Sequence, residues 1–398
     1  MLTTGEARET ILSAVSTLAT ETAALGDASG RVLREVVRAE RDQPPFDRVM
    51  MDGIAIAFAD FDSGRRQFPI QATQSAGDAA LELQPEQCIE IMTGASLPRH
   101  ADCIVPVERI SVADGVATIA ADYSAEQHQF IHARASDHAA GTELLTPGKT
   151  ISALDIAIVA SCGMTTVKVS QRPTIRVIST GNELVPAGKP IAPHQVRLSN
   201  GPAIQAMLTA HGFPDCTHDH LVDEPALMRE RIAEHLESAD VLILSGGVSM
   251  GKADYVPTVL ADLGVKVLCH KVSQRPGKPM WFGVGPEGQT VFALPGNPVS
   301  ALVCCRHYVV PALAAASSIT AEPPEFASLA VDVRFTPDLT CFQPVRLLSS
   351  AAGQVLAMPV KTNTSGDFTA LSATDGYVEL VKGQDDFPAG APVFVYRW

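Results

Sequence analysis

Three apolar segments between residues 174 and 318 each run directly into a polar loop that contains glycine, and this repeated junction is the strongest constraint on the fold. The junctions read IRVISTGNEL, VLILSGGVSMGKADY and VFALPGNPVSA. Their apolar parts are typical of buried strands, and helical patterns such as GPAIQAMLTAHG and YVPTVLADLG lie between them. This alternation predicts an α/β domain with a mainly parallel sheet.

The three loops are expected to form one pocket, because the carboxyl ends of parallel strands share one edge and ligands bind there. Main-chain N–H groups of glycines and nearby hydroxyls would hold a phosphate. The residues proposed for this role are Ser245, Gly246, Gly247, Ser249, Gly251, Gly296 and Asn297. Asn297 is expected to cap the following helix with its side chain, and Pro298 fits the first helical turn. An ordinary strand-to-helix turn is the alternative for each loop taken alone.

Two common nucleotide motifs are absent from these loops. None of them matches the dinucleotide fingerprint GxGxxG or the P-loop GxxxxGK[ST]. Ser245 has no histidine within its own motif. These observations disfavour nicotinamide binding, nucleotide triphosphatase activity and serine hydrolase chemistry.

A basic segment follows the second loop. Lys266, Lys271, Arg275 and Lys278 lie between Asp262 and Glu287 with no acidic residue among them. Lysines at a strand edge that discourage unwanted pairing are one explanation. Proline and glycine beside Arg275 and Lys278 favour a shaped loop that contacts an oxyanion or a phosphate.

Several carboxylates fall in loops and are candidates for a metal site. They are Asp52, Asp137, Glu183, Asp223 and Asp254. Each alone is more often a turn or cap residue, but two or three together near phosphates would hold Mg²⁺. His218 and His220 are expected to lie on the surface, because no matching cysteine or aspartate set accompanies them.

The charge of the whole chain restricts its partners. Lys and Arg number 30 and Asp and Glu number 44, which gives a net charge of −14 and disfavours nucleic acid and anionic membranes. The first ten residues lack the pattern of a secretory signal, and the eight cysteines show no CxxC spacing. We therefore expect a cytoplasmic protein without a disulfide framework.

Pattern changes along the 398 residues divide the chain into four parts. Residues 1–42 and 141–171 are predicted to form a discontinuous helical linking domain, starting with a capping box at Thr3 and Glu6. Residues 43–140 show short alternating runs and predict a β-rich domain. Residues 172–318 form the predicted three-layer α/β domain, and residues 319–398 a small β domain.

Six motifs in this order resemble the molybdopterin molybdenumtransferase family, which includes MoeA proteins and the gephyrin E domain. They are PPFDRVMMDGIA, IMTGASLPRHADCIVPVE, STGNELV, SGGVSMGKADY, PGKPMWFG and LPGNPVSA. The resemblance implies that molybdate is placed on the dithiolene of adenylated molybdopterin and that AMP is released in a Mg²⁺-dependent reaction. The glycine loops and the basic segment would hold the pterin phosphate and molybdate.

The resemblance also implies roles for individual residues. Asp52, Thr93, Asp137, Glu183, Asp223 and Asp254 would be catalytic, with Glu183 and Asp254 as ligands of Mg²⁺. Substrate would be bound by Gly181, Ser245, Gly246, Gly247, Ser249, Gly251, Lys271, Arg275, Lys278, Pro295, Gly296, Asn297, Pro298 and Ser300.

Family members are homodimers in which the β-rich part of one chain faces the α/β domain of its partner. Contacts with the adenylyltransferase and with recipient molybdoenzymes are further expected partners. The chain departs from the family pattern at His132 and Pro344, where arginine is usual. Two functions are therefore compared: an active molybdenum insertase, and a molybdopterin-binding carrier or scaffold that does not catalyse insertion.

Overall fold

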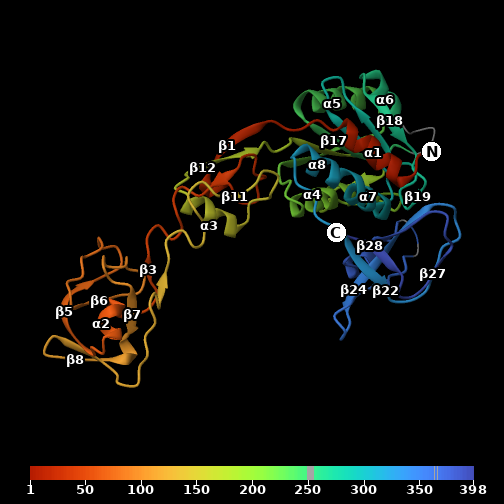
Figure 1. The fold of residues 1–398 in the computed structure, drawn as a ribbon. Helices are drawn as coiled ribbons and strands as arrows, with labels where there is room; N and C mark the ends of the chain where they lie inside the picture. The colour runs from red at the N-terminus through yellow and green to blue at the C-terminus, as the bar shows by residue number, and fades with distance from the viewer. Residues whose placement is uncertain (249–254, 363, 365) are drawn as a thin grey trace.

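The structure is a computed structural model that describes residues 1–248, 255–362, 364 and 366–398. The chain is elongated, with a β-rich lobe at one end and the α/β domain at the other (Figure 1). A linking domain lies between them, and the C-terminal β domain lies against the α/β domain (Figure 1).

The α/β domain is built on a six-stranded sheet in the order β16-β13-β17-β21-β20-β18. The first four strands are parallel. At the edge, β20 pairs antiparallel with β21, and β18 pairs antiparallel with β20. The strands are β13 (Ile175–Thr180), β16 (Cys216–Leu221), β17 (Val241–Ser245), β18 (Lys266–His270), β20 (Trp281–Val284) and β21 (Thr290–Leu294). The predicted mainly parallel sheet is confirmed.

Helices cover both faces of this sheet, because each face presents its own set of buried apolar side chains. One core joins the sheet to α4 (Asn200–Ala210), α7 (Pro298–Cys304) and α8 (Val310–Ala316). The other joins it to α5 (Pro225–Ser238) and α6 (Val256–Asp262). The domain is therefore three-layered, as predicted.

The first helix, α1 (Thr4–Ala14), begins with the predicted capping box between Thr3 and Glu6. Its buried residues Ala7 and Ile11 pack in the same core as Val177 and Tyr308 of the α/β domain. In Figure 1 the helix lies on that domain and the chain then runs away toward the lobe. The first helix thus packs apart from the linking domain to which the sequence pattern had assigned residues 1–42.

A continuous helical segment runs from α7 through a π-helical turn, Cys305–Val309, into α8. It is the one helix among the described residues that is long and apolar enough to cross a membrane, and 72% of its apolar window is buried. Its apolar side chains, including Cys304 and Leu313, belong to the core of the α/β domain.

The linking domain has a small core of its own, from Ala23 to Val169 in sequence. It contains β1 (Thr20–Ala24), β2 (Val37–Arg38), β11 (Glu143–Leu145), α3 (Ala153–Ser161) and β12 (Thr166–Ser170). Strand β1 pairs with β12 and β2 with β11, which joins the two separate stretches of chain. Ser152 and Asp155 form a capping box at the start of α3.

The β-rich lobe contains a sheet in the order β7-β4-β6-β5-β9-β8, with a core on each face. Its elements are β3 (Arg48–Val49), β4 (Gly53–Ile56), α2 (Phe58–Asp62), β5 (Gln67–Gln74), β6 (Cys88–Ile91), β7 (Cys103–Pro106), β8 (Ile110–Ala113), β9 (Val116–Ile119) and β10 (Ile131–His132). Strands β3 and β10 pair beside this sheet and lead back to the linking domain (Figure 1).

The C-terminal domain is a closed barrel, because its strands pair in the ring β24-β25-β22-β28-β26 and β26 pairs again with β24. The strands are β22 (Glu325–Leu329), β24 (Thr340–Ser349), β25 (Val355–Pro359), β26 (Gly376–Leu380) and β28 (Pro392–Arg397). A short strand of the α/β domain, β19 (Gln274–Arg275), pairs with β24. The basic segment therefore connects the two domains.

Candidate functional site

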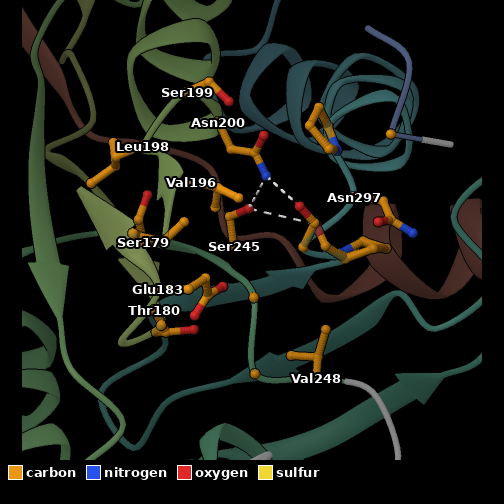
Figure 2. A pocket seen from close by; sticks show the side chains of 18 of the residues that line it. Ser179, Thr180, Glu183, Val196, Leu198, Ser199, Asn200, Ser245, Val248 and Asn297 are labelled. Carbon is orange, nitrogen blue, oxygen red and sulfur yellow. Dashed lines mark hydrogen bonds between the residues drawn. The ribbon is translucent and has the colours of Figure 1, made fainter. Parts of the chain in front are cut away.

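A cavity of about 850 Å³ lies at the carboxyl edge of the sheet, where β13, β17 and β21 end (Figure 2). All three glycine-bearing loops line it, so the structure brings them together as the strand order requires. The described lining consists of Ser179, Thr180, Gly181, Glu183, Leu184, Val196, Arg197, Leu198, Ser199, Asn200, Asp223, Ser245, Gly246, Gly247, Val248, Pro279, Pro295, Gly296, Asn297, Pro298, Gly366 and Phe368.

The loops touch one another through glycine. A Cβ at Gly246 would lie 2.7 Å from the Thr180 carbonyl oxygen and 2.8 Å from its Oγ1. Gly246 also has a φ of +103°, a conformation that other residues rarely adopt. On its other side, a Cβ at Gly296 would lie 3.6 Å from the Gly246 Cα. Only glycine at position 246 lets the second loop fit between the first and the third.

Asn200, at the start of α4, holds the second and third loops together. Its Nδ2 donates to Ser245 Oγ and to the Gly296 carbonyl oxygen, each at 2.9 Å (Figure 2). Ser245 Oγ in turn donates to the Pro295 carbonyl oxygen at 3.5 Å. The sequence analysis missed Asn200, because its motif SNGPA reads as the start of an ordinary helix.

Asn297 occupies the N-cap position of α7 and Pro298 its first turn, as predicted. The side chain of Asn297, however, makes no capping hydrogen bond with that helix. The expectation that Asn297 caps α7 through its side chain is therefore wrong. Its side chain instead stands at the rim of the cavity (Figure 2).

Two acids, Glu183 and Asp223, line the cavity. Asp223 is fixed by a reciprocal pair of bonds: Asn182 N–H donates to its carboxylate at 3.3 Å, and its own N–H donates to Asn182 Oδ1 at 3.0 Å. Glu183 begins the segment that forms β14 (Leu184–Val185), which pairs with β15 (Val196–Arg197) along the cavity wall.

Buried hydroxyl groups line the same wall. Ser179, Thr180 and Ser245 are 1%, 4% and 3% exposed. The Oγ1 of Thr180 has no hydrogen-bond partner among the described residues. Neutral donors are thus concentrated where the three strands end.

The C-terminal barrel contributes Gly366 and Phe368 to the lining. The aromatic ring and Leu184, Val196 and Leu198 add apolar surface to the lining. The sequence offered no signal for Phe368, since it lies in a loop of a different domain.

The basic segment lies beside the cavity. Pro279 lines the cavity, whereas Lys271, Arg275 and Lys278 are not among its described lining residues. Arg275 and Lys278 are exposed, and Arg275 belongs to β19 against the barrel. Ser300, proposed to bind substrate, is buried in α7 and is likewise absent from the described lining. Ser249, Gly251 and Asp254 lie outside the described residues.

Asp52 and Thr93 lie in the lobe and form a tight local pair. Thr93 donates to Asp52 Oδ1 from its Oγ1 and from its backbone N–H, each at 2.6 Å. These two bonds lower the pKa of Asp52, the side-chain bond being the larger cause. Asp52 is therefore an exposed carboxylate that is held in one orientation and stays ionised.

Asp137 belongs to a second group of the lobe. His132 Nε2 lies 2.9 Å from Asp137 Oδ1, and Arg48 Nη2 lies 3.0 Å from His132 Nδ1. Arginine can only donate, so His132 accepts from Arg48 at Nδ1 and donates to Asp137 from Nε2. A cation from Arg48 thus stands beside His132, the position where the sequence analysis noted a missing arginine. The other departure, Pro344, is buried in β24, and Arg346 is exposed.

Within the described residues, no three His, Cys, Asp or Glu side chains gather closely enough to hold a metal ion. His218 and His220 are half-buried, not surface residues as expected, and they contact the first loop. His220 Nε2 lies 2.9 Å from the Gly181 carbonyl oxygen and donates to it.

The fold and the cavity define a class: a multidomain α/β protein whose small-molecule site lies at the carboxyl edge of a mainly parallel sheet. Three family models match successive parts of the chain. They are the MoeA N-terminal region over residues 2–163, a probable molybdopterin binding domain over 176–315 and the MoeA C-terminal region over 327–398.

Known relatives are similar to this chain along most of its length. The chain is 40% identical to the molybdopterin molybdenumtransferase of Synechocystis over 93% of each chain. It is 33% identical to that of Nostoc over 74% of this chain and 69% of the relative. The MoeA protein of Pyrococcus horikoshii superposes with a TM-score of 0.83 at 28% identity, covering 100% of this chain and 99% of the other. The chain belongs to the molybdopterin molybdenumtransferase (MoeA) family.

Proposed function

We propose that this protein inserts molybdenum from molybdate into adenylated molybdopterin and releases AMP. The observation that carries the proposal is the single cavity in which three glycine loops, buried hydroxyls and two acids converge. Apart from Gly366 and Phe368, its described lining lies within the stretch that matches a probable molybdopterin binding domain. Membership of the family supports a transferase acting in molybdenum cofactor biosynthesis.

The lining suggests how the substrate would be held. Main-chain N–H groups at Gly246 and Gly247 and the hydroxyls of Ser179, Thr180 and Ser245 are suited to phosphate oxygens. Phe368 and the apolar lining residues Leu184, Val196 and Leu198 are suited to a flat heterocycle. Lys271, Arg275 and Lys278 would supply positive charge from the adjoining loop on the barrel side.

Mg²⁺ is part of the proposal, and the residues present fit it. Glu183 and Asp223 offer carboxylate oxygens in the same cavity as the proposed phosphate groups, and Mg²⁺ prefers oxygen ligands shared with substrate and water. When bound, the ion would polarise the phosphoanhydride and offset charge on the departing AMP. The two acids would also order the water or oxyanion that takes part in phosphoanhydride cleavage.

We further propose that the working unit is a homodimer. Asp52, Thr93 and Asp137 lie in the lobe, far along the elongated chain from the cavity (Figure 1). The carboxylates of Asp52 and Asp137 are exposed and are oriented by Thr93 and His132, which suits groups that face a partner subunit. In this arrangement the lobe of one chain would complete the cavity of the other.

The cellular setting of the proposal follows from its substrates. The protein would act in the cytoplasm, receiving adenylated molybdopterin from the adenylyltransferase and passing the finished cofactor to recipient molybdoenzymes. Pull-down of those enzymes with the purified full chain tests these contacts, and loss of binding at high salt would indicate a charged interface.

The direct test incubates the purified protein with adenylated molybdopterin, molybdate and Mg²⁺ and measures AMP. We expect AMP release that requires both molybdate and Mg²⁺. Retention of the pterin without AMP release would overturn the insertase proposal and favour the carrier. Glu183→Gln is the informative variant and Glu237→Gln, exposed on α5 away from the cavity, is its matched control.

A further inference from the structure

Ser179 and His218 form a buried pair at the wall of the cavity. Ser179, near the end of β13, is 1% exposed and lines the cavity. Its Oγ lies 3.0 Å from Nε2 of His218 on the neighbouring strand β16. Figure 2 shows Ser179 beside Val196 and Leu198, on the wall that carries the hydroxyl groups.

The ring of His218 is held in place by its surroundings. It packs against Gly201 of α4, where a Cβ would lie 2.1 Å from the His218 Nε2. The absence of a side chain at Gly201 therefore makes room for the ring, and any other residue there would displace it. Burial lowers the pKa of His218, so the imidazole is neutral near pH 7.

The charged groups around His218 are few. Asp219 and His220 flank it on its own strand, and they shift its pKa in opposite directions. On β13, Arg176 is engaged with Thr217 at 2.8 Å. Helix α4, which covers the ring, has no charged residue between Asn200 and Ala210.

A serine hydroxyl has one proton, so the state of His218 decides where that proton points. If His218 Nε2 carries no proton, Ser179 donates to it and shows only lone pairs to the cavity. If Nε2 carries a proton, it donates to Ser179 Oγ and the Ser179 proton is free to point into the cavity.

We propose that His218 sets the hydrogen-bonding polarity of Ser179, and that a phosphate group bound in the cavity selects the form with the proton on Nε2. Ser179 is then a ligand-binding residue and His218 a positioning residue behind it. The inference rests on the proposed function insofar as that function puts a phosphate ester in this cavity.

The charges of the lining give this proton its importance. Glu183 and Asp223 are acceptors, and the guanidinium of Arg197 donates to the carbonyl oxygens of Pro186 and Lys189. Main-chain N–H groups, hydroxyls, side-chain amides and the remaining N–H groups of Arg197 are the donors that the described lining offers to a phosphate. An outward-pointing Ser179 proton adds a donor, whereas lone pairs alone would repel an anion.

The test reads the His218 tautomer directly. Full-length protein labelled with ¹⁵N-histidine is examined by NMR with AMP, with molybdopterin that has not been adenylated, and with adenosine as the control without phosphate. We expect AMP, molybdopterin or both to move the His218 proton to Nε2, and adenosine to leave the signals unchanged. Which of the two acts will show which phosphate lies at Ser179. Ser179→Ala and His218→Gln assign the signals.

Binding measurements complete the test. Ser179→Ala should weaken binding of the effective phosphate ester by roughly tenfold to a hundredfold, the usual range for a hydrogen bond to a charged group. In the wild type, affinity should rise as the pH falls through the pKa of His218. Titration of the ligand also changes affinity with pH, and the His218→Gln variant measures that change alone. The rise in the wild type should therefore exceed the rise in the variant.

Three results would overturn the inference: a His218 proton that stays on Nδ1 when each ester that binds saturates the protein, full affinity in Ser179→Ala, or failure of both esters to bind. A wild type that binds the ester and shifts the tautomer but releases no AMP would count against the proposed function alone, because the tautomer is read on binding and not on turnover.

Discussion

The cavity of the α/β domain and the exposed acids of the lobe are built in opposite ways. The cavity is made from the ends of three strands, from α4 and from a loop of the barrel, all far apart in sequence. In the lobe, Asp52 and Thr93 are joined by two direct hydrogen bonds, and Asp137 is held by His132 five residues away. One region encloses a cavity, whereas the other presents oriented carboxylates.

This difference suggests a division of labour. Main-chain donors and buried hydroxyls are rigid and suited to binding, because the fold fixes them before the ligand arrives. Exposed carboxylates cost little to orient with local bonds, but they need a second surface to become dehydrated and effective. Under the dimer proposal, that surface would be the cavity of the partner subunit.

The largest expected effect tests whether the two regions act together across chains. Asp52→Asn and Glu183→Gln should each lower AMP release by about 10² to 10⁴-fold, the usual range for a group that transfers a proton. Co-refolding the two inactive variants should restore about a quarter of the wild-type rate, because a two-chain site is intact once in each mixed dimer. Asp122→Asn, exposed on the same lobe, is the control that should stay active.

An inactive mixture would contradict the shared site. This interpretation requires that mixed dimers form. A different affinity tag on each variant, followed by purification on both tags, establishes that they do. If mixed dimers form and remain inactive, the lobe and the cavity do not complete one another across chains.

The next prediction compares the free energy of unfolding of the two regions. Ile89 of β6 and Ile243 of β17 are both 0% exposed, in the cores of the lobe and of the α/β domain. Replacing either by alanine should lower the free energy of unfolding by about 2 to 5 kcal/mol, and valine by about 0.5 to 1.5 kcal/mol. Calorimetry of the full chain should show AMP raising the transition lowered by Ile243→Ala more than the one lowered by Ile89→Ala, because AMP stabilises the domain that binds it. Equal protection would mean that the regions are not independent.

A smaller effect tests the rigidity of the cavity. Asn200→Ala removes two hydrogen bonds that join the second and third loops, each worth about 0.5 to 1.5 kcal/mol. We expect roughly tenfold weaker binding of AMP by titration calorimetry, with little change in the melting temperature. Thr209→Ala, exposed on the same helix, is the matched control. Unchanged affinity would show that the loops hold their positions without Asn200.

The smallest expected effect concerns the local pair of the lobe. Thr93→Val removes the side-chain bond that is the main cause of the lowered pKa of Asp52. The pKa of Asp52 should then rise, so the carboxylate becomes protonated at a higher pH and the acid limb of the rate profile moves upward. Thr93→Ser, which keeps the hydroxyl, should leave that limb in place. An unmoved acid limb in the valine variant would show that another group limits the rate at low pH.

Local patterns predicted most of the fold. The capping box at Thr3 begins a helix as expected, and the apolar runs before the three glycine loops are parallel strands. These features depend on near neighbours, such as a side chain that bonds to an N–H three residues on. Asp52 and Thr93, 41 positions apart, were proposed together because their motifs resemble those of the family and not because of a local pattern.

The sequence by itself determined that three glycine loops converge, because parallel strands that end in turns leave no other place for them. Only the tertiary structure decided which other groups join them. Asn200, Phe368 and His218 come from a helix start, a barrel loop and an edge strand, and none stands in a motif that marks it. The basic segment lies against the barrel because β19 pairs with β24. Packing between distant segments decides such contacts, and no pattern of adjacent residues encodes them.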